Sequence, residues 1–373
     1  MNLTGVITEY NPFHHGHIHH LKKARELTNP DAIIAVMSGN FVQRGEPAIL
    51  DKYSRTRAAL KNGVDLVLEL PFPFCIQSAQ QFADCSIRIL ALAKVNSLVF
   101  GSESGDLSAL QEIARLPIRT DHIKESLAKG ESYPSALFLE TGALPPNDIL
   151  AVSYLKALAD TKIKPIAILR TNDYLNPSLN KENASALAIR QAVWEKKDVQ
   201  PYTVMAELLS KQEIHPFAHY YPTLRLLLLN QSRKRLAESF LMDEGIEAFL
   251  FDNARHCPTL FEFLNKSVSR RYTRSRIQRI LCALLAQIEK EQIKKLVAPQ
   301  FIRVLGFNDT GRKALKYLKQ QEVQIATCFA ALPPQYRRLA FQEAVAYSSA
   351  FSAKAAQLIL ERELQGPVII TGP

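Results

Sequence analysis

Short apolar runs alternate with amphipathic segments in the chain up to about Arg190. The apolar runs predict β-strands at Leu3–Ile7, Ala32–Met37, Leu66–Leu70, Ser97–Phe100 and Pro165–Leu169. The amphipathic segments predict helices at Gly16–Leu27, Lys52–Asn62, Ser78–Ala93 and Ile149–Ala159. Apolar strands that alternate with helices are typical of an α/β fold with a parallel, doubly wound sheet. Ligands bind such sheets beyond the carboxyl ends of the strands, so the loops there should hold the functional residues.

From about Pro201 the pattern changes, and helical periodicity replaces the strand-like runs. Helices are predicted at Thr223–Leu229, Arg233–Leu241 and Ser275–Lys295. With 373 residues the chain is long enough for two domains of ordinary size. We therefore predict a sheet-containing domain at residues 1–198 and a C-terminal, mainly α-helical domain at residues 199–373.

The loop after the first strand carries the pattern H-x-G-H, formed by His14, Gly16 and His17. It stands where a helix begins, and a helix N-terminus offers unpaired N–H groups and partial positive charge to a phosphate. Gly16 has no Cβ, so a ligand can approach the backbone closely. The two imidazoles can donate N–H bonds to phosphate oxygens that gain charge during a reaction. A chance match, or a metal-binding tract formed by five histidines within seven residues, is the alternative interpretation.

Other loops at the same sheet edge add candidate residues. The polar segment Ser38–Pro47, with two glycines and few apolar anchors, is interpreted as a mobile lid, or otherwise as an ordinary turn. Gly101 would let a flat base or a ribose lie against a strand tip, or would only form a tight turn. Arg170 ends the fifth strand and can hold phosphate oxygens with two parallel bonds. Ser185 is a predicted helix N-cap, and Arg190 follows in the same helix.

Composition limits the class of protein. Hydrophobic residues make up 47% and charged residues 22%, as in ordinary globular proteins. No run approaches the ~18–20 apolar residues that span a membrane, and the chain starts with a strand pattern instead of a signal peptide. The five cysteines are far apart and form no C-x-x-C, so neither a disulfide framework nor a zinc site is indicated. We expect a cytoplasmic protein with no membrane contact.

The net charge of +10 suggests a polyanionic partner. Residues 266–279, KSVSRRYTRSRIQR, hold six basic residues, no acidic residue and one tyrosine. This arrangement suits binding to RNA phosphates with one stacked base, although a solvated helix face is the alternative. The predicted RNA-binding residues are Arg270, Arg271, Tyr272, Arg274, Arg276 and Arg279. Further basic residues that favour RNA binding are Arg303, Arg312, Lys313 and Lys316.

Longer stretches carry a resemblance to a known family. H-x-G-H occurs in nucleotidylyltransferases and resembles the HIGH box of class I tRNA synthetases. The segment ASALAIR resembles their second signature, S-S/A-T-x-I-R, with Leu187 in place of the usual Thr. Over nearly the whole chain, the sequence resembles the bacterial tRNA(Met) cytidine acetate ligases. The matching stretches are EYNPFHHGHIHHL, MSGNFVQRGEPAILDKYSRTRAAL, NGVDLVLELP, FGSE, RRYTRSRIQRIL and FIRVLGFNDTGR.

The resemblance implies a nucleotidylyltransferase fold and a two-step reaction. ATP and acetate would give acetyl-adenylate, and the acetyl group would pass to N4 of the wobble cytidine of elongator tRNA(Met). By position, the ATP contacts fall on Ile7, Thr8, Glu9, Tyr10, Asn11, Pro12, Phe13, His14, His15, Gly16, His17, Ile18, His19, His20, Gly101, Asn147 and Arg170. The predicted catalytic residues are His14, His17, Arg170 and Arg190. Asn147 is alternatively only the N-cap of its helix.

Mg²⁺ is expected to accompany the triphosphate, but no carboxylate cage is evident, so no metal ligand is predicted. No protein partner is indicated. Two rival interpretations use the same features. A small-molecule adenylyltransferase would make a dinucleotide or a precursor of coenzyme A, and a non-catalytic RNA-binding protein would keep only a degenerate nucleotide fold. The acyl donor and the identity of the tRNA come from the resemblance alone.

Overall fold

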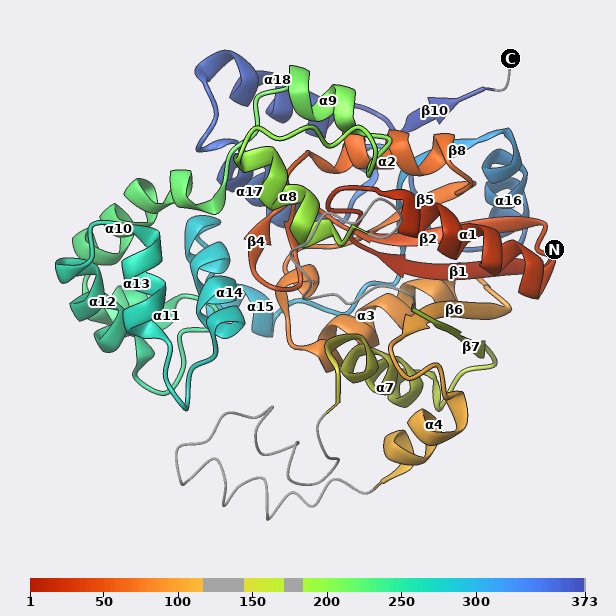
Figure 1. The fold of residues 1–373 in the computed structure, drawn as a ribbon, viewed down its shortest axis with the longest axis horizontal. Helices are drawn as coiled ribbons and strands as arrows, with labels where there is room; N and C mark the ends of the chain where they lie inside the picture. Colours follow the sequence, from red (N-terminus) through yellow and green to blue (C-terminus); the bar gives the residue numbers. More distant parts are fainter. Residues whose placement is uncertain (117–143, 171–183, 372–373) are drawn as a thin grey trace.

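A mostly parallel sheet with helices on both faces organises the protein (Figure 1). The computed structural model describes residues 1–116, 144–170 and 184–371. In that part the sheet has eight strands in the order β10-β8-β5-β2-β1-β6-β7, with β9 paired to β8. The strands are β1 Leu3–Thr8, β2 Ala32–Ser38, β5 Leu66–Leu70, β6 Ser97–Ser102, β7 Lys164–Leu169, β8 Ile302–Asn308, β9 Ile325–Ala326 and β10 Val368–Ile370. All five strands predicted for the first part of the chain are confirmed, with bounds within two residues.

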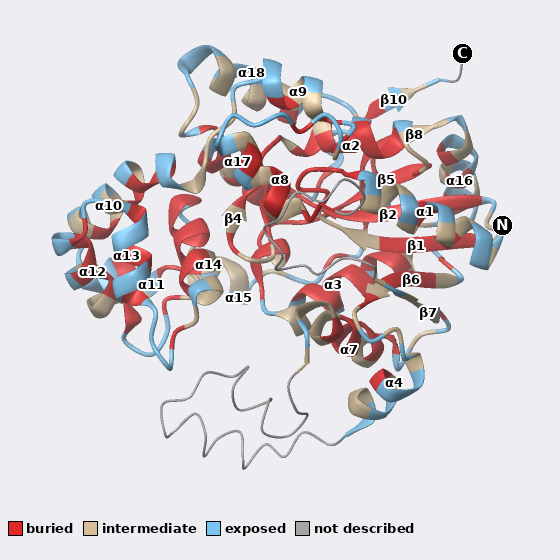
Figure 2. Cartoon of the chain, viewed as in Figure 1, coloured by how far each residue is buried: buried red, intermediate tan, exposed pale blue. Residues whose placement is uncertain are grey.

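The chain order places the switch point of the sheet beside β1. From β1 the chain adds β2 and β5 on one side, and it then crosses to add β6 and β7 on the other. The connecting helices are α1 His15–Thr28, α2 Lys52–Lys61, α3 Ala79–Leu92, α4 Leu107–Arg115 and α7 Pro146–Leu158, with a 3₁₀ turn at η1 Phe74–Ile76. Every residue of β2 is buried, since helices cover both faces of the sheet (Figure 2). The carboxyl ends of β1 and β6 therefore form the expected ligand-binding edge.

After β7 the chain forms a helical unit beside the sheet. The segment that leads to it contains α8 Ala186–Trp194, α9 Ala206–Lys211 and η2 Phe217–Tyr220. The helical unit itself consists of α10 Tyr221–Asn230, α11 Arg233–Glu238, α12 Ile246–His256, α13 Leu260–Ser267, α14 Arg274–Leu285 and α15 Lys290–Lys294. The predicted single helix Ser275–Lys295 is wrong, because the chain turns between α14 and α15 with Gln287 at a positive φ of 51°.

The expectation that strands end near Pro201 is also wrong. β8 pairs antiparallel with β5, and β10 pairs parallel with β8, so the last part of the chain completes the main sheet. The C-terminal helices are α16 Asp309–Gln320, η3 Phe329–Ala331, α17 Pro334–Ser348 and α18 Ala353–Leu364. The domain division at residues 198 and 199 stays a prediction, and the strands that follow it belong to the sheet of the first domain.

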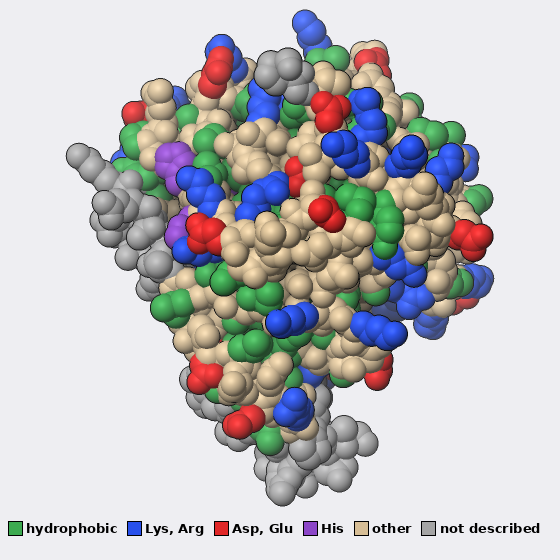
Figure 3. Space-filling model, turned by 90° about the vertical axis from the view of Figure 1, so that its right-hand side faces the viewer, with side chains coloured by type: hydrophobic (Ala, Val, Ile, Leu, Met, Phe, Trp, Pro, Cys, Tyr) green, Lys and Arg blue, Asp and Glu red, His purple; other side chains and the backbone are tan. Residues whose placement is uncertain are grey.

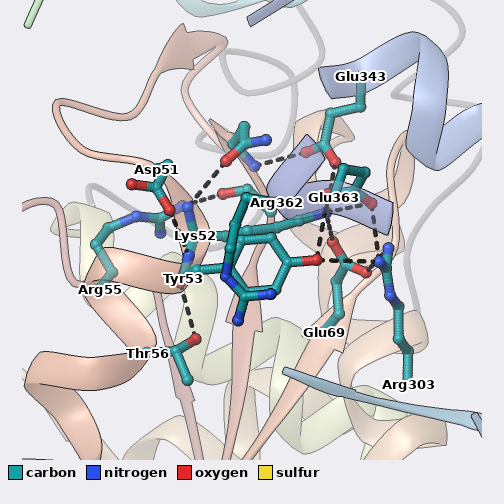
Figure 4. Close-up of polar contacts among 12 residues, drawn as sticks. Asp51, Lys52, Tyr53, Arg55, Thr56, Glu69, Arg303, Glu343, Arg362 and Glu363 are labelled. Carbon is teal, nitrogen blue, oxygen red and sulfur yellow. Dashed lines mark hydrogen bonds and ion pairs between the residues drawn. The ribbon is translucent and has the colours of Figure 1, made fainter. Parts of the chain in front are cut away.

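Five ionisable side chains from distant parts of the chain meet in the interior (Figure 4). We call Lys52, Glu69, Arg303, Glu343 and Glu363 the buried charge cluster. Lys52 Nζ lies 2.6 Å from Glu69 Oε1, 2.9 Å from Glu363 Oε2 and 3.3 Å from Glu343 Oε2. Arg303 reaches Glu69 Oε2 at 2.6 Å and Glu363 Oε1 at 2.8 Å. The cluster ties α2 and β5 to β8, α17 and α18.

Surface charge is mixed on the face that carries α1 and α16, where Lys and Arg side chains lie among acidic ones (Figure 3).

In the described part of the chain, no helix has the length and apolarity needed to cross a membrane.

Candidate active site

The start of α1 uses both histidines of the H-x-G-H motif as helix caps. His14 is the N-cap residue, and its Nδ1 accepts the N–H of Gly16 at 3.1 Å. His17 Nδ1 accepts the N–H of His14, also at 3.1 Å. In a neutral imidazole one nitrogen accepts and the other carries the proton, so both rings must carry theirs on Nε2. The cap therefore fixes two Nε2–H donors in rings that line the cleft.

Burial keeps these rings neutral. It lowers the pKa of His14 to about 3, and the positive charges of Arg170 and His15 add to the effect. The pKa of His17 is well below its usual range, from burial first and then from His14 and Arg170. Burial also lowers the pKa of His20 to about 4, and the positive charge of Arg170 is the second cause. The rings are thus hydrogen-bond donors without net charge, suited to stabilise charge that develops on phosphate oxygens.

Aromatic packing holds the two imidazoles in place. The ring centroids of His14 and His17 lie 3.8 Å apart, and Tyr10 meets His17 edge-on at 4.8 Å. Phe13 is fully buried behind them, 4.6 Å from Tyr10. Tyr10 and Phe13 therefore serve the site through packing, which prealigns the donors.

A large cleft opens at this edge of the sheet, with a volume of about 1530 Å³. Thr8, Gly101 and Arg170 line it from the strand ends, and Arg276 and Arg279 line it from α14. Its volume exceeds the roughly 300–1000 Å³ of an ordinary ligand pocket. The cleft has room for a nucleotide and part of a second substrate.

Four buried side-chain atoms of residues that line the cleft have no hydrogen-bond partner within the described ranges: Thr8 Oγ1, Tyr10 Oη, His20 Nε2 and Arg170 Nε. The described residues contain no group of three or more His, Cys, Asp or Glu side chains that could hold a metal ion. The alternative of a metal-binding histidine tract therefore gains no support from the described part of the chain.

Gly101 and Arg170 lie side by side at the tips of β6 and β7. A Cβ on Gly101 would come within 3.0 Å of Arg170 Cγ, so the glycine leaves the room in which the arginine side chain lies. The backbone N–H of Arg170 donates to Ser102 O at 2.8 Å and holds the residue at the strand end. Both predicted residues thus line the cleft together.

Arg190 braces the histidine loop from α8. Its Nη1 donates to Asn11 O at 2.7 Å, and its Nη2 lies 3.5 Å from Glu46 Oε2. Ser185 is the N-cap of α8, as predicted, and accepts the N–H of Ala188 at 3.1 Å. Arg190 therefore reaches the cleft from a capped and oriented helix.

Asn147 is held by an acid that sequence reasoning did not single out. The N-cap of α7 is Pro145, so the interpretation of Asn147 as the N-cap is wrong. Instead Glu103 accepts from Asn147 Nδ2 at 2.5 Å and from the N–H of Asp148 at 3.0 Å. Glu103 is the last residue of the stretch FGSE and follows β6 directly. Its position at a strand end was the one feature of the sequence that could have identified it as a site residue.

The segment Ser38–Pro47 is a packed hairpin, which contradicts the expectation of few apolar anchors. It forms the short strands β3 Phe41–Val42 and β4 Glu46–Pro47, and Phe41 and Val42 are buried. Gly45, at a φ of +81°, lies so close to α14 that a Cβ would overlap the backbone there. The hairpin is a fixed contact between the sheet edge and the helical unit. The lid interpretation, which needs a weakly held loop, loses its structural basis.

The predicted RNA-binding residues differ in how far they are exposed. Arg270, Arg271 and Arg274 are exposed, whereas Tyr272 is only 9% exposed. The centroid of the Tyr272 ring lies 5.1 Å from Arg276 Cζ and 5.6 Å from Arg271 Cζ. The predicted stacking of a base on Tyr272 is therefore unsupported, because its ring packs into the helical unit.

Arg279 donates to Gln77 O at 2.9 Å, and burial lowers its pKa to about 10. It lines the cleft together with Arg271 and Arg276. Arg303 is in the buried charge cluster, so it cannot contact RNA as expected.

Together, the doubly wound sheet and the H-x-G-H motif at the start of α1 indicate a nucleotidyl transferase. Residues 1–362 match the family model described as HIGH Nucleotidyl Transferase. The chain is 36% identical to the tRNA(Met) cytidine acetate ligase of Oceanobacillus iheyensis, over 99% of this chain and 100% of that protein. It is 33% identical to the ligase of the same name from Geobacillus sp., with the same coverage. The chain therefore belongs to the family of tRNA(Met) cytidine acetate ligases.

Solved structures agree with this assignment. The crystal structure of apo Thermotoga maritima TmcAL superimposes with a TM-score of 0.89 at 30% identity, and all of both chains is covered. TmcAL bound with alpha-thio ATP superimposes with a TM-score of 0.87 at 31% identity, again over both whole chains. The predicted fold class and family are thus confirmed.

Proposed function

We propose that this protein is an ATP-dependent ligase that activates acetate as acetyl-adenylate. It then transfers the acetyl group to N4 of the wobble cytidine of elongator tRNA(Met), which forms N4-acetylcytidine. The observation that carries the proposal is the pair of neutral Nε2–H donors at the α1 start, in a cleft that Arg276 and Arg279 of α14 also line. The names of its relatives and the ATP analogue bound to TmcAL support the same chemistry.

In the first step ATP lies across the strand tips with its phosphates at the α1 start. An acetate oxygen attacks the α-phosphorus, and pyrophosphate leaves. His14 and His17 donate to the oxygens that gain charge, while Arg170 and Arg190 orient the phosphates. Positioning and charge stabilisation supply most of the rate in such reactions.

Mg²⁺ commonly accompanies a triphosphate. The described residues form no carboxylate cluster for it, so we assign it no protein ligand and no step.

In the second step the exocyclic amine of cytidine attacks the acetyl carbon, and AMP leaves. The base has to leave the stack of the anticodon loop to enter the cleft. We assign tRNA binding to the exposed arginines at the start of α14, because Arg271 and Arg276 also line the cleft rim. Each of these two arginines lies near Glu244, at 3.3 Å and 3.2 Å respectively.

The test is incubation with ATP, labelled acetate and total tRNA, followed by nucleoside analysis. We expect labelled N4-acetylcytidine that depends on all three substrates. Pyrophosphate release that requires a mononucleotide or phosphopantetheine, and not acetate, would instead identify a small-molecule adenylyltransferase. Absence of ATP–pyrophosphate exchange under every condition would support the non-catalytic RNA-binding protein.

The tRNA surface is tested by charge reversal. Changing Arg270, Arg271 and Arg274 to Glu should weaken tRNA binding and make its salt dependence shallower, because fewer counterions are released. The affinity for ATP should not change. A matched control reverses Arg312, Lys313 and Lys316. The sequence also predicted these residues to favour RNA binding, but they lie on α16, at the opposite end of the molecule from α14 (Figure 1). Equal losses in both variants, measured by filter binding over a salt series, would contradict a specific surface at α14.

A further inference from the structure

One carboxylate in the cleft, so far predicted only as an ATP contact, takes no part in the adenylation step proposed above. Glu9 follows directly after β1, lines the cleft and is partly exposed to it. Its Oε1 accepts the N–H of Gln43 at 2.7 Å, from the β3–β4 hairpin. Its Oε2 has no hydrogen-bond partner among the residues described. The side chain is thus fixed through one oxygen and offers the other to the cleft.

The surroundings of Glu9 make it more basic than an ordinary carboxylate. Burial raises its pKa, and the Gln43 N–H and the charges of Arg190, Arg44 and Arg55 only partly oppose this. These groups face it from the hairpin, α8 and α2. Tyr154 faces it from α7. Burial raises the pKa of the Tyr154 phenol, and the negative charge of Glu9 raises it further. The positive charges of the arginines stabilise the ionised form of Glu9, whereas burial raises its pKa and makes it a better proton acceptor.

The other acids in the cleft are paired. Glu46 lies 3.5 Å from Arg190 Nη2 and accepts from Gln278 Nε2 at 3.1 Å. Asp243 lies 2.9 Å from Lys290 Nζ. His14 and His17 use Nδ1 for the helix cap, so neither has a nitrogen free to accept a proton. Of the described acids that line the cleft, Glu9 is the one with a free oxygen and no ion pair.

The second step of the proposed reaction needs such a base. The N4 amine of cytidine is a poor nucleophile because its lone pair is delocalised into the ring. Attack on the acetyl carbon puts positive charge on N4 unless a proton leaves. General base catalysis typically contributes about 10²–10⁴-fold in rate.

We propose that Glu9 accepts the N4 proton of the target cytidine, and that the base enters the cleft beside the β3–β4 hairpin. This inference rests on the proposed function. The N4–C bond to the acetyl group forms, and the C–O bond to the AMP phosphate breaks with its electron pair on AMP. The N4 proton moves to Glu9 Oε2. No further reactant is needed.

The test is Glu9→Gln, which keeps an oxygen to accept the Gln43 N–H but removes the basic group. We expect the transfer of acetyl to tRNA to fall by about 10²–10⁴-fold. Acetate-dependent ATP–pyrophosphate exchange, and trapping of acetyl-adenylate by hydroxylamine, should persist well above the level of a His14 variant. The affinity for tRNA should be unchanged. Glu26→Gln, at an exposed ion pair on α1, is the control of equal charge change.

A pH series separates a base from a positioning group. In the parent enzyme transfer should fall as the pH drops through the raised pKa of Glu9, because the protonated carboxyl cannot accept a proton. Glu9→Gln should lose this dependence, and Glu9→Asp should retain part of it. Parental transfer by Glu9→Gln, or an equal loss of exchange and transfer, would overturn the proposal. So would loss of transfer on His15→Gln with Glu9→Gln unaffected. A parent enzyme that forms no N4-acetylcytidine would overturn the proposed function as well.

Discussion

Each imidazole of the H-x-G-H motif uses its two nitrogens for different purposes. Nδ1 of His14 and of His17 closes the first turn of α1, and this leaves Nε2–H as the donor toward the cleft. Helix capping and phosphate recognition thus depend on the same side chains. A replacement by alanine would remove the helix cap and the Nε2–H donor together, so their effects could not be separated. The informative variant keeps the cap and removes the donor.

His14→Asn is that variant. Asn is among the best N-cap residues, so its Oδ1 should still accept from the first turn. It has no donor at the position of Nε2, and losing one preorganised donor typically costs about 10²–10³-fold in rate. We expect near-parental thermal unfolding with ATP–pyrophosphate exchange lowered by that factor. Exchange at the parental rate in the folded variant would refute the role of His14.

The buried imidazoles also predict how stability depends on pH. His14 and His20 have pKa values of about 3 and about 4, below the ordinary value near 6.5. Between these values the unfolded chain binds more protons than the folded one, so acidification favours unfolding. Their contribution to stability is complete above pH 6.5 and is lost as the pH falls toward 3. His20→Gln should make this slope shallower in urea unfolding at several pH values, and an unchanged slope would contradict the neutral buried state.

Among the elements, the β3–β4 hairpin has the most consequence for the site. Its tip packs on α14, its Gln43 N–H holds Glu9, and its Glu46 contacts Arg190. The hairpin therefore connects the sheet edge, where the phosphates would bind, to the helical unit. The close contact at Gly45 is possible only because that residue has no side chain.

Gly45→Ala tests this connection. A Cβ there would overlap the backbone of Gln278 and Arg279, and the positive φ of 81° adds strain. Overpacking of this kind costs about 1–3 kcal/mol, and the hairpin should shift away from α14. We expect lower stability together with weaker acetyl transfer. The control is Gly366→Ala, where a Cβ meets nothing within 4 Å. Equal behaviour of the two variants in thermal unfolding would show that the contact is unimportant.

The elements also show what could be predicted from the sequence. The strands β1, β2, β5, β6 and β7 and the start of α1 follow from local apolar runs and one motif, so they were predicted. β8 was missed because Arg303 interrupts its apolar run, and this residue is buried only where Glu69 and Glu363 neutralise it. Gln43 and Glu103 act through contacts that depend on the tertiary fold, so no local pattern could identify them.

At the scale of the whole molecule, the buried charge cluster joins the two ends of the chain. Lys52 is fully buried, and burial alone would lower its pKa, yet Glu343, Glu363 and Glu69 raise it well above its ordinary value. Burial in turn raises the pKa of Glu343. Removing one partner of such a group leaves its counter-charges unpaired in the interior.

Lys52→Met should destabilise the protein by about 3–5 kcal/mol. The loss should be smaller at low pH, because protonation neutralises the carboxylates that remain. Lys23→Met, at the exposed pair with Glu26, is the control and should change stability by less than about 1 kcal/mol. Urea unfolding at several pH values provides the measurement. A loss similar to that of the control would mean that the cluster is not an ionic tie.

The pairing of β5 with β8 also bears on how this protein is made. The ribosome delivers β5 more than 200 residues before β8, which at about 5–20 residues per second is an interval of roughly ten seconds to a minute. During that interval the nascent sheet has an open edge at β5, and open edges invite pairing with other chains. Lys52 likewise waits for Glu343 and Glu363. We expect the nascent chain to depend on chaperones, and premature termination before β8 to yield aggregates.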